Sequence, residues 1–210
     1  VCSSDLPSTG FVEAVSDKDS KNGLILMGIE AVLTGLYLYV LLQKIVSATM
    51  SGINSVFGTS RTAAQTPSLG GFFGYGIIIA IIVSLVIAAL VMGLMKAMAE
   101  ADINWFQSCQ IAGMRSLGLS LGWILGILGL FLGMYQFAIL IIVVGGVLGM
   151  IYMIVAMMSY PNTKKDMIAY VVLITILVAT FISYFVLKEF VLSSLINNGG
   201  STTNFLNNIL

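Results

Sequence analysis

Hydrophobic side chains fill five long segments of the chain, and polar residues collect between them. The apolar segments cover residues 23–43, 72–95, 117–133, 137–159 and 167–187. A helix needs about 20 mainly apolar residues to cross the hydrocarbon of a bilayer, and each segment is near that length. Helices of soluble proteins keep a polar face, which these segments lack. The pattern therefore predicts an all-α fold, a polytopic transmembrane helical bundle of five spans.

The polar segments divide the chain into three parts. Residues 1–22 form a polar leader, residues 23–192 hold the five-span domain, and residues 193–210, rich in Asn, Gly, Ser and Thr, form a tail expected to be flexible. The first six residues have the sequence that a common sequencing adapter gives on translation. We therefore interpret residues 1–6 as a candidate artefact and leave Cys2 out of the functional argument.

The stretch of residues 97–116, between the second and third apolar segments, is the most polar internal region. Asn104 followed by Gln107 is typical of a capped helix start. Apolar residues then recur at helical spacing, which fits an amphipathic helix at the membrane surface with Trp105 at headgroup depth. A simple cytoplasmic extension of the third span fits equally well, so the pattern leaves both interpretations open.

Composition excludes most enzyme chemistry. Charged residues make up 9% of the 210 residues, against about 25% in soluble domains. The chain has no histidine, which removes the commonest general base and metal ligand. With only two cysteines, it has too few thiols for a disulfide framework or a cysteine-based zinc site. We expect no catalytic residues, no metal and no cofactor, and we interpret Cys109 as a packing residue.

Charge distribution predicts the orientation. The nine basic and nine acidic residues cancel, so no basic patch indicates nucleic acid as a partner. Five spans place the ends of the bundle on opposite sides of the membrane. Six basic residues fall on the amino-terminal side and three on the other: Lys18, Lys21, Lys96, Arg115, Lys164 and Lys165 against Lys44, Arg61 and Lys188. The positive-inside rule then favours a cytoplasmic N-terminus and an outside C-terminus.

Glycines in the third and fourth segments recur three or four residues apart. Such spacing puts them on one helix face, where another helix can approach closely. The predicted packing glycines are Gly118, Gly122, Gly126, Gly129 and Gly133 in the third segment, and Gly145 and Gly149 in the fourth. The alternative is that glycine is simply frequent in membrane helices. The partner helix belongs either to this chain or to a second copy.

Glu30 is the only acidic residue well inside an apolar segment. An unpaired carboxylate at that depth costs about 2.5–3.5 kcal/mol even on the lower scales. We therefore expect Glu30 to face the bundle and to pair with Lys96 or Arg115, both predicted to lie on the same side of the membrane. The structural interpretation makes it a charge-pair residue, and the functional one makes it a proton or cation site.

The layout resembles the Yip family of five-span membrane proteins, named for binding Ypt/Rab GTPases. The resemblance spans residues 11–190. It rests on Trp105-Phe106-Gln107 before the third span, the segment 116–133, the close hairpin after it and Lys164-Lys165 before the last span. Eukaryotic members are implied to act in membrane traffic. The family offers no catalytic residues to transfer.

The resemblance implies a non-catalytic membrane protein with a structural or interaction role in membrane organisation or trafficking. Its partners would be the lipid bilayer and other membrane proteins or further copies of the chain. Ser/Thr/Asn-rich loops and Met-rich spans favour a bacterial cytoplasmic membrane, so GTPase binding is not carried over. The alternative is a small transporter or channel subunit, which would line a path with polar groups inside the membrane.

Overall fold

The computed structural model of the chain describes residues 21–57, 70–161 and 163–198. The proposed artefact at residues 1–6, most of the leader, and residues 199–210 of the tail lie outside them. Five helices account for most of the described residues: α2 (Asn22–Phe57), α3 (Gly70–Ala97), α4 (Trp105–Phe131), α5 (Tyr135–Met158) and α6 (Lys165–Asn198).

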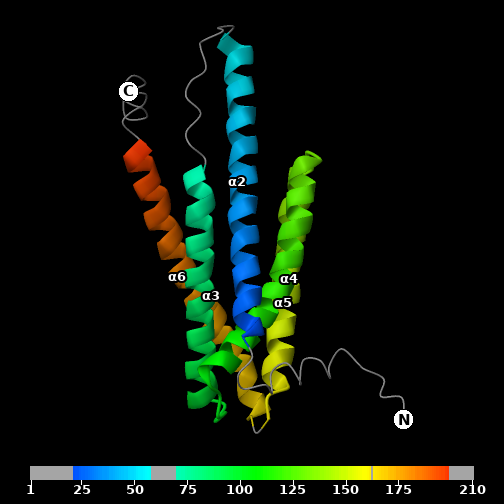
Figure 1. Cartoon of the computed structure of the whole chain (residues 1–210), viewed down its shortest axis with the longest axis vertical. Coiled ribbons are helices and arrows are strands. Elements are labelled where there is room, and N and C mark those ends of the chain that lie inside the picture. The colour runs from blue at the N-terminus through cyan, green and yellow to red at the C-terminus, as the bar shows by residue number, and fades with distance from the viewer. Residues whose placement is uncertain (1–20, 58–69, 162, 199–210) are drawn as a thin grey trace, which may run out of the picture.

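All five helices are long and apolar enough to cross a membrane. The membrane-compatible parts are Asn22–Ser47, Phe73–Ala97, Trp105–Phe131, Tyr135–Met158 and Lys165–Phe185. The helices alternate in direction, so α2 begins at one end of the bundle and α6 finishes at the other (Figure 1). The predicted fold class is confirmed: the protein is an all-α bundle with five candidate membrane spans.

Two helices run beyond the apolar segments from which they were predicted. α2 continues past residue 43 to Phe57, and α6 continues past residue 187 to Asn198. The predicted flexible tail therefore begins as helix, and so does the predicted connector after α2. Neither stretch contains a proline, so nothing in the local sequence stops the helix where hydrophobicity falls.

α4 begins at Trp105 rather than near residue 117, where the apolar segment starts. Asn104 caps it as predicted: its side chain accepts from the Gln107 backbone N–H at 2.9 Å, and the Gln107 side chain accepts from the Asn104 N–H at 3.0 Å. Of the two interpretations of this stretch, the helix that extends the third span is the one observed. Residues 107–113 are buried on every side by neighbouring helices, so no face is left for the membrane surface.

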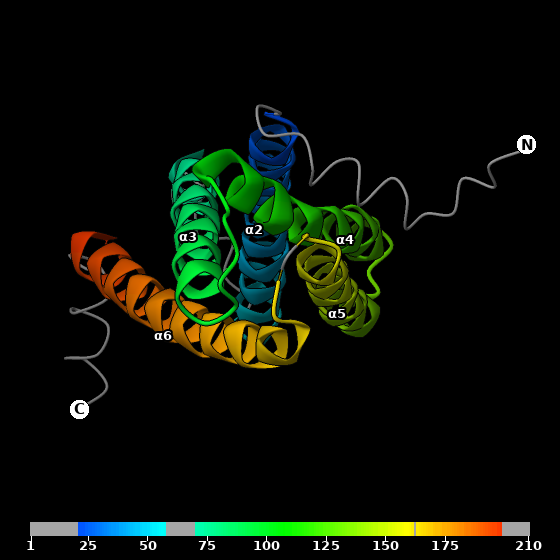
Figure 2. The same ribbon diagram turned by 90° about the horizontal axis from the view of Figure 1, so that it is seen from below.

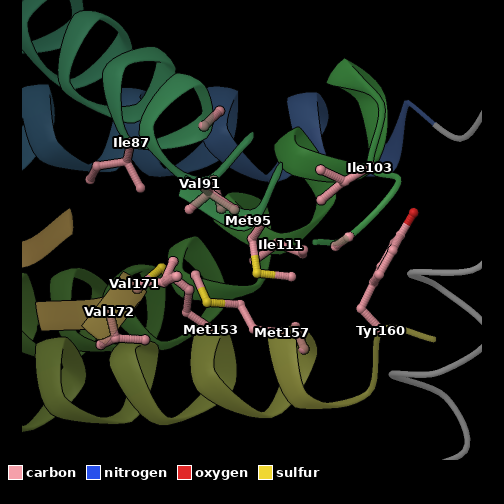
Figure 3. Close-up of a cluster of buried hydrophobic side chains, with 14 of the residues drawn as sticks. Ile87, Val91, Met95, Ile103, Ile111, Met153, Met157, Tyr160, Val171 and Val172 are labelled. Atoms are coloured by element: carbon pink, nitrogen blue, oxygen red, sulfur yellow. The ribbon is translucent and has the colours of Figure 1, made fainter. Parts of the chain in front are cut away.

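The helices are arranged around α4. α2 packs between α3 and α4, α5 packs along α4, and α6 lies against α3 and touches α5 (Figure 2). The largest core cluster joins all five helices near the end of the bundle where α2 begins (Figure 3). Met95, Met153 and Met157 are fully buried there, and their flexible thioethers fill the irregular space between the helices.

The connections at this end are tied to each other. The Lys164 backbone N–H donates to the Ala99 carbonyl at 3.1 Å, and Lys164 also forms an exposed ion pair with Glu100. The Tyr160 hydroxyl lies 2.6 Å from the Asp102 carbonyl and 3.0 Å from Gln107 Oε1. These contacts join the α3–α4 connection to the α5–α6 connection and hold the amino-terminal half of α4 in place.

Candidate functional site

A polar cluster lies inside the bundle where α2, α3 and α4 meet. Glu30 comes from α2, Ser84 from α3, and Arg115 and Ser116 from α4. Between 0% and 7% of each residue's surface is exposed, which makes this the most buried charge in the described chain. The candidate site is therefore an intramembrane ion pair joined by two hydroxyl groups.

Glu30 is the acceptor at the centre of the cluster. Arg115 Nη2 donates to its two carboxylate oxygens at 3.0 and 3.2 Å. Ser84 Oγ donates to Oε2 at 3.3 Å, and Ser116 Oγ forms a second hydroxyl contact with the same oxygen. Arg115 Nη2 also lies 3.2 Å from Ser84 Oγ. Three helices are thus joined through one carboxylate.

Glycines allow the helices to come close enough for these contacts. A Cβ on Gly113 would lie 2.7 Å from Gly23 Cα, so α2 and α4 are nearly in backbone contact two residues before Arg115 on α4 and seven residues before Glu30 on α2. On the other side of α4, a Cβ on Gly149 would lie 2.5 Å from the Arg115 carbonyl oxygen. The Arg115 backbone is therefore held between α2 and α5, and its side chain reaches Glu30.

The electrostatics of the cluster are balanced. One positive and one negative charge face each other in a low-dielectric interior, where separating them from water is expensive and pairing offsets that cost. Removing one partner of a buried pair typically costs about 3–5 kcal/mol, because the other charge is left uncompensated. The cluster therefore makes the positions of α2, α3 and α4 depend on one another.

Lys96, the other predicted partner of Glu30, does not join the cluster. It lies on α3, twelve residues after Ser84, so it is about 18 Å further along the helix axis at 1.5 Å per residue. Its side chain is exposed at the end of the bundle. The structure thus brings Glu30 together with Arg115 and leaves Lys96 at the membrane surface.

The glycines of α4 and α5 face each other. A Cβ on Gly118 would lie 2.6 Å from Gly149 Cα, and one on Gly145 would lie 2.7 Å from Gly122 Cα. Further along, Gly126 faces the side chains of Ile142 and Tyr37, and Gly129 faces Ala138. The partner helix therefore belongs to the same chain.

Gly133 does not share this role, and the prediction is wrong for this residue. It follows the end of α4 with a φ of +75°, and a Cβ on it would have nothing within 4 Å. Its N–H donates to the Leu130 carbonyl and the Met134 N–H donates to the Gly129 carbonyl, at 3.2 and 2.9 Å. This pair of bonds is a Schellman motif, in which glycine ends a helix in the left-handed conformation.

Sequence reasoning missed some of the closest contacts. Ser84 and Ser116 were not proposed as partners of Glu30, although Ser84 is the single hydroxyl in the centre of its segment and Ser116 follows Arg115 directly. A second glycine contact also went unnoticed: a Cβ on Gly76 would lie 2.9 Å from Gly35 Cα, at the α2–α3 interface. Gly35 lies on α2 and Gly76 on α3, so the spacing of glycines along a single helix does not reveal this contact.

The remaining chemistry-bearing groups in the core serve packing. Cys109 is 1% exposed, and its carbonyl lies against Gly23 of α2, so the thiol is enclosed. Outside the spans, burial raises the pKa of the Tyr160 phenol, and the Asp102 charge raises it further, while the hydrogen bond to Gln107 acts in the opposite direction. Among the described residues, no three His, Cys, Asp or Glu side chains gather to hold a metal ion.

The chain matches no protein-family model, no curated protein and no solved structure.

Proposed function

We propose that this integral membrane protein is non-catalytic and has a structural or interaction role in membrane organisation or trafficking, similar to the Yip family. The observation that supports the proposal is the pairing of Glu30 with Arg115. The charged groups deep in the described bundle bind each other and two serine hydroxyls, which joins helices and leaves the charges balanced. In this role the cluster fixes the arrangement of the helices whose outer faces contact lipid and neighbouring proteins.

An interaction role is tested on the outer face of α5. Val143 and Val147 of α5 are 60% and 57% exposed. A photo-crosslinking amino acid at Val147, activated in native membranes, is expected to give discrete protein adducts. The same amino acid at Ile25 of α2, which is 60% exposed on another side, serves as the control. Lipid adducts alone at both positions would contradict an interaction role for this face.

A small transporter or channel subunit is the second candidate, and one observation favours it. Ionisable groups at membrane depth commonly mark ion or substrate pathways, and the buried Arg115 Nε has no hydrogen-bond partner among the described residues. Reconstituted wild-type protein and Glu30→Gln protein separate the two functions. Proton or cation flux that appears in wild-type liposomes and is lost in the variant would replace the structural role by transport.

We also propose a bacterial cytoplasmic membrane and a cytoplasmic N-terminus. Arg115 lies inside α4, so it no longer counts among the basic residues at the membrane surface. Among the described residues, Lys21, Lys96, Lys164 and Lys165 lie at the end where α2 begins, against Lys44 and Lys188 at the other. The positive-inside rule still favours the first end as cytoplasmic. A reporter fused after Leu210 should report the outside, and a cytoplasmic signal would reverse the orientation.

A further inference from the structure

The turn between α4 and α5 presents an apolar surface at the end of the bundle opposite to the start of α2 (Figure 1). We call residues 131–137, which form this turn and the adjoining helix ends, the α4–α5 tip. Five large apolar side chains of the tip are between 45% and 74% exposed: Phe131, Leu132, Met134, Tyr135 and Phe137. Large apolar side chains gathered on one surface mark a place that contacts lipid or protein rather than water.

The absence of charge separates the α4–α5 tip from the two other described connections. The α3–α4 connection contains Glu100 and Asp102, and the α5–α6 connection contains Lys164. By contrast, residues 116–163 contain no charged residue at all. Connections that lie in water are normally polar, because apolar side chains there would stay exposed to it. The composition of the tip therefore favours contact with lipid.

α2 shows at what depth the tip lies. The Lys44 ammonium is 5.9 Å from the centre of the Phe131 ring, a cation–π contact between α2 and the tip. Lys44 follows the apolar segment of α2, so its ammonium marks the surface of the membrane. α2 continues beyond Lys44 to Phe57, about 20 Å further along its axis at 1.5 Å per residue, whereas the hairpin turns back (Figure 1). The tip therefore reaches the membrane surface and goes no further.

The backbone of the turn is suited to the boundary between acyl chains and headgroups. The N–H groups of Gly133 and Met134 donate to carbonyls of α4 at 3.2 and 2.9 Å, which satisfies polar groups that hydrocarbon cannot. Met134, at the N-cap of α5, forms no side-chain hydrogen bond there, so the first N–H groups of α5 have to bond to water or to headgroups. Apolar side chains and backbone donors are both satisfied at this boundary, where tyrosines such as Tyr135 also concentrate.

We propose that the α4–α5 tip is a lipid-binding surface, which inserts its apolar side chains into the membrane leaflet at that end of the bundle while Lys44 lies beside it at headgroup level. Lipid is the occupant because the tip continues the outer faces of α4 and α5, where Leu128 and Ile139 are 53% and 60% exposed to the bilayer. The inference goes beyond the proposed structural or interaction role, and it holds for either orientation of the bundle.

The test measures how deep the tip lies in phosphatidylcholine nanodiscs, in which both membrane faces are open to solutes. A bimane label on Leu132→Cys reports on the most exposed residue of the tip, and one on Lys165→Cys is the matched control at the charged α5–α6 connection. Cys2→Ser in both proteins leaves the enclosed Cys109, and the same protein without a new cysteine gives the blank.

Two quenchers are compared, a nitroxide on the lipid acyl chain and iodide in the water. We expect the nitroxide to quench the Leu132 label several times more strongly than iodide does, and the order to be reversed for the Lys165 label. Iodide quenching of the Leu132 label as strong as that of the Lys165 label would overturn the proposal, because the tip would lie in water. Weak quenching by both agents would also overturn it, because a protein would then cover the tip.

Wild-type protein decides the question if the labelled variants are not recovered folded. Met134 lies on the tip and is 51% exposed, and Met167, 38% exposed, lies two residues after Lys165. An anionic oxidant confined to water, such as chloramine-T, should oxidise Met167 several times faster than Met134 in nanodiscs, although Met134 is the less covered by protein. Oxidation of Met134 at an equal or higher rate would overturn the proposal. Neither result depends on the flux or crosslinking experiments.

Discussion

The two halves of α4 contact their neighbours by different means. Its amino-terminal half is mostly buried and meets α2 and α3 through Arg115 and Ser116, which bind Glu30 and Ser84. Its carboxy-terminal half meets α5 through glycines, with one side exposed to lipid. The first interface is specified by hydrogen bonds between a few polar side chains. The second is specified by successive glycines, which let the two backbones approach closely. They should therefore respond to mutation in different ways.

The glycine interface should give the largest effect. In Gly118→Leu the new side chain would meet the α5 backbone at Gly149, which cannot rotate away as a side chain can. We expect a loss of about 5 kcal/mol or more, above the usual cost of overpacking, because the α5 backbone has to move away as a whole. Thermal unfolding in detergent measures it. Gly93→Leu is the matched control, because a Cβ there has nothing within 4 Å; an equal loss in both variants would mean that the close contact is unimportant.

Mutation of the polar interface should give the next largest loss of stability. Arg115→Met leaves Glu30 buried without its counter-charge, and we expect a loss of about 3–5 kcal/mol. The double variant Glu30→Met/Arg115→Met removes both charges and should recover part of that loss. A double-mutant cycle from thermal unfolding gives the coupling energy. Additive losses in the cycle would show that the two side chains do not depend on each other.

Gly133 separates two uses of glycine on the same helix. Gly133→Ala should cost roughly 1–2 kcal/mol, because an alanine strains the left-handed backbone. Gly133→Asn should cost less, since Asn tolerates this conformation. Both effects are expected to be smaller than that of Gly118→Leu, because Gly133 packs against nothing. Unfolding curves of the three variants rank them, and an Asn variant as unstable as the Ala variant would argue against a conformational cause.

Loss of the Tyr160 contacts that join the α3–α4 connection to the α5–α6 connection should give the smallest effect. Tyr160→Phe removes one hydroxyl contact with Asp102 and Gln107, so we expect a loss of about 1 kcal/mol at neutral pH. The pKa of Tyr160 is raised in the folded state, so its contribution is complete below the ordinary pKa of 10.0 and is lost as the pH rises through the folded value. Wild-type unfolding followed above pH 10.0 should converge on that of Tyr160→Phe. A constant gap between the two proteins would contradict the assignment.

The comparison also explains what the sequence could predict. Gly118, Gly122 and Gly126 lie at a spacing that any helix converts into a face, so the glycine interface is readable from one segment. Gly133 has the same spacing, but the packing prediction is wrong for it because α4 ends before this residue. The spacing of glycines does not show where a helix ends.

The polar interface could be predicted only in part. The position of Glu30 deep inside an apolar segment predicted that it pairs with a basic residue, and Arg115 was one of two candidates. Choosing between Arg115 and Lys96 requires knowing that α4 begins at Trp105 and carries Arg115 inside the bundle. The capped start at Asn104 was predicted, but low hydropathy left open whether the residues after it lie inside the bundle, because polar residues buried by protein resemble polar residues in water. The pairing of Ser84 with Glu30 depends on the α2–α3 approach at Gly35 and Gly76, which single-segment patterns do not contain.

The Glu30–Arg115 contact has a consequence for the order of events during synthesis. The two residues are 85 positions apart, and Ser84 lies 54 positions after Glu30. At ~5–20 residues per second, Arg115 is made roughly 4–17 s after Glu30. Until the third span arrives, the first span must therefore wait at the translocation machinery or enter the bilayer with the Glu30 charge unpaired, at a cost of about 2.5–3.5 kcal/mol. The assembly of this protein is timed by translation, and its first helix reaches its final environment only when α4 has been delivered beside it.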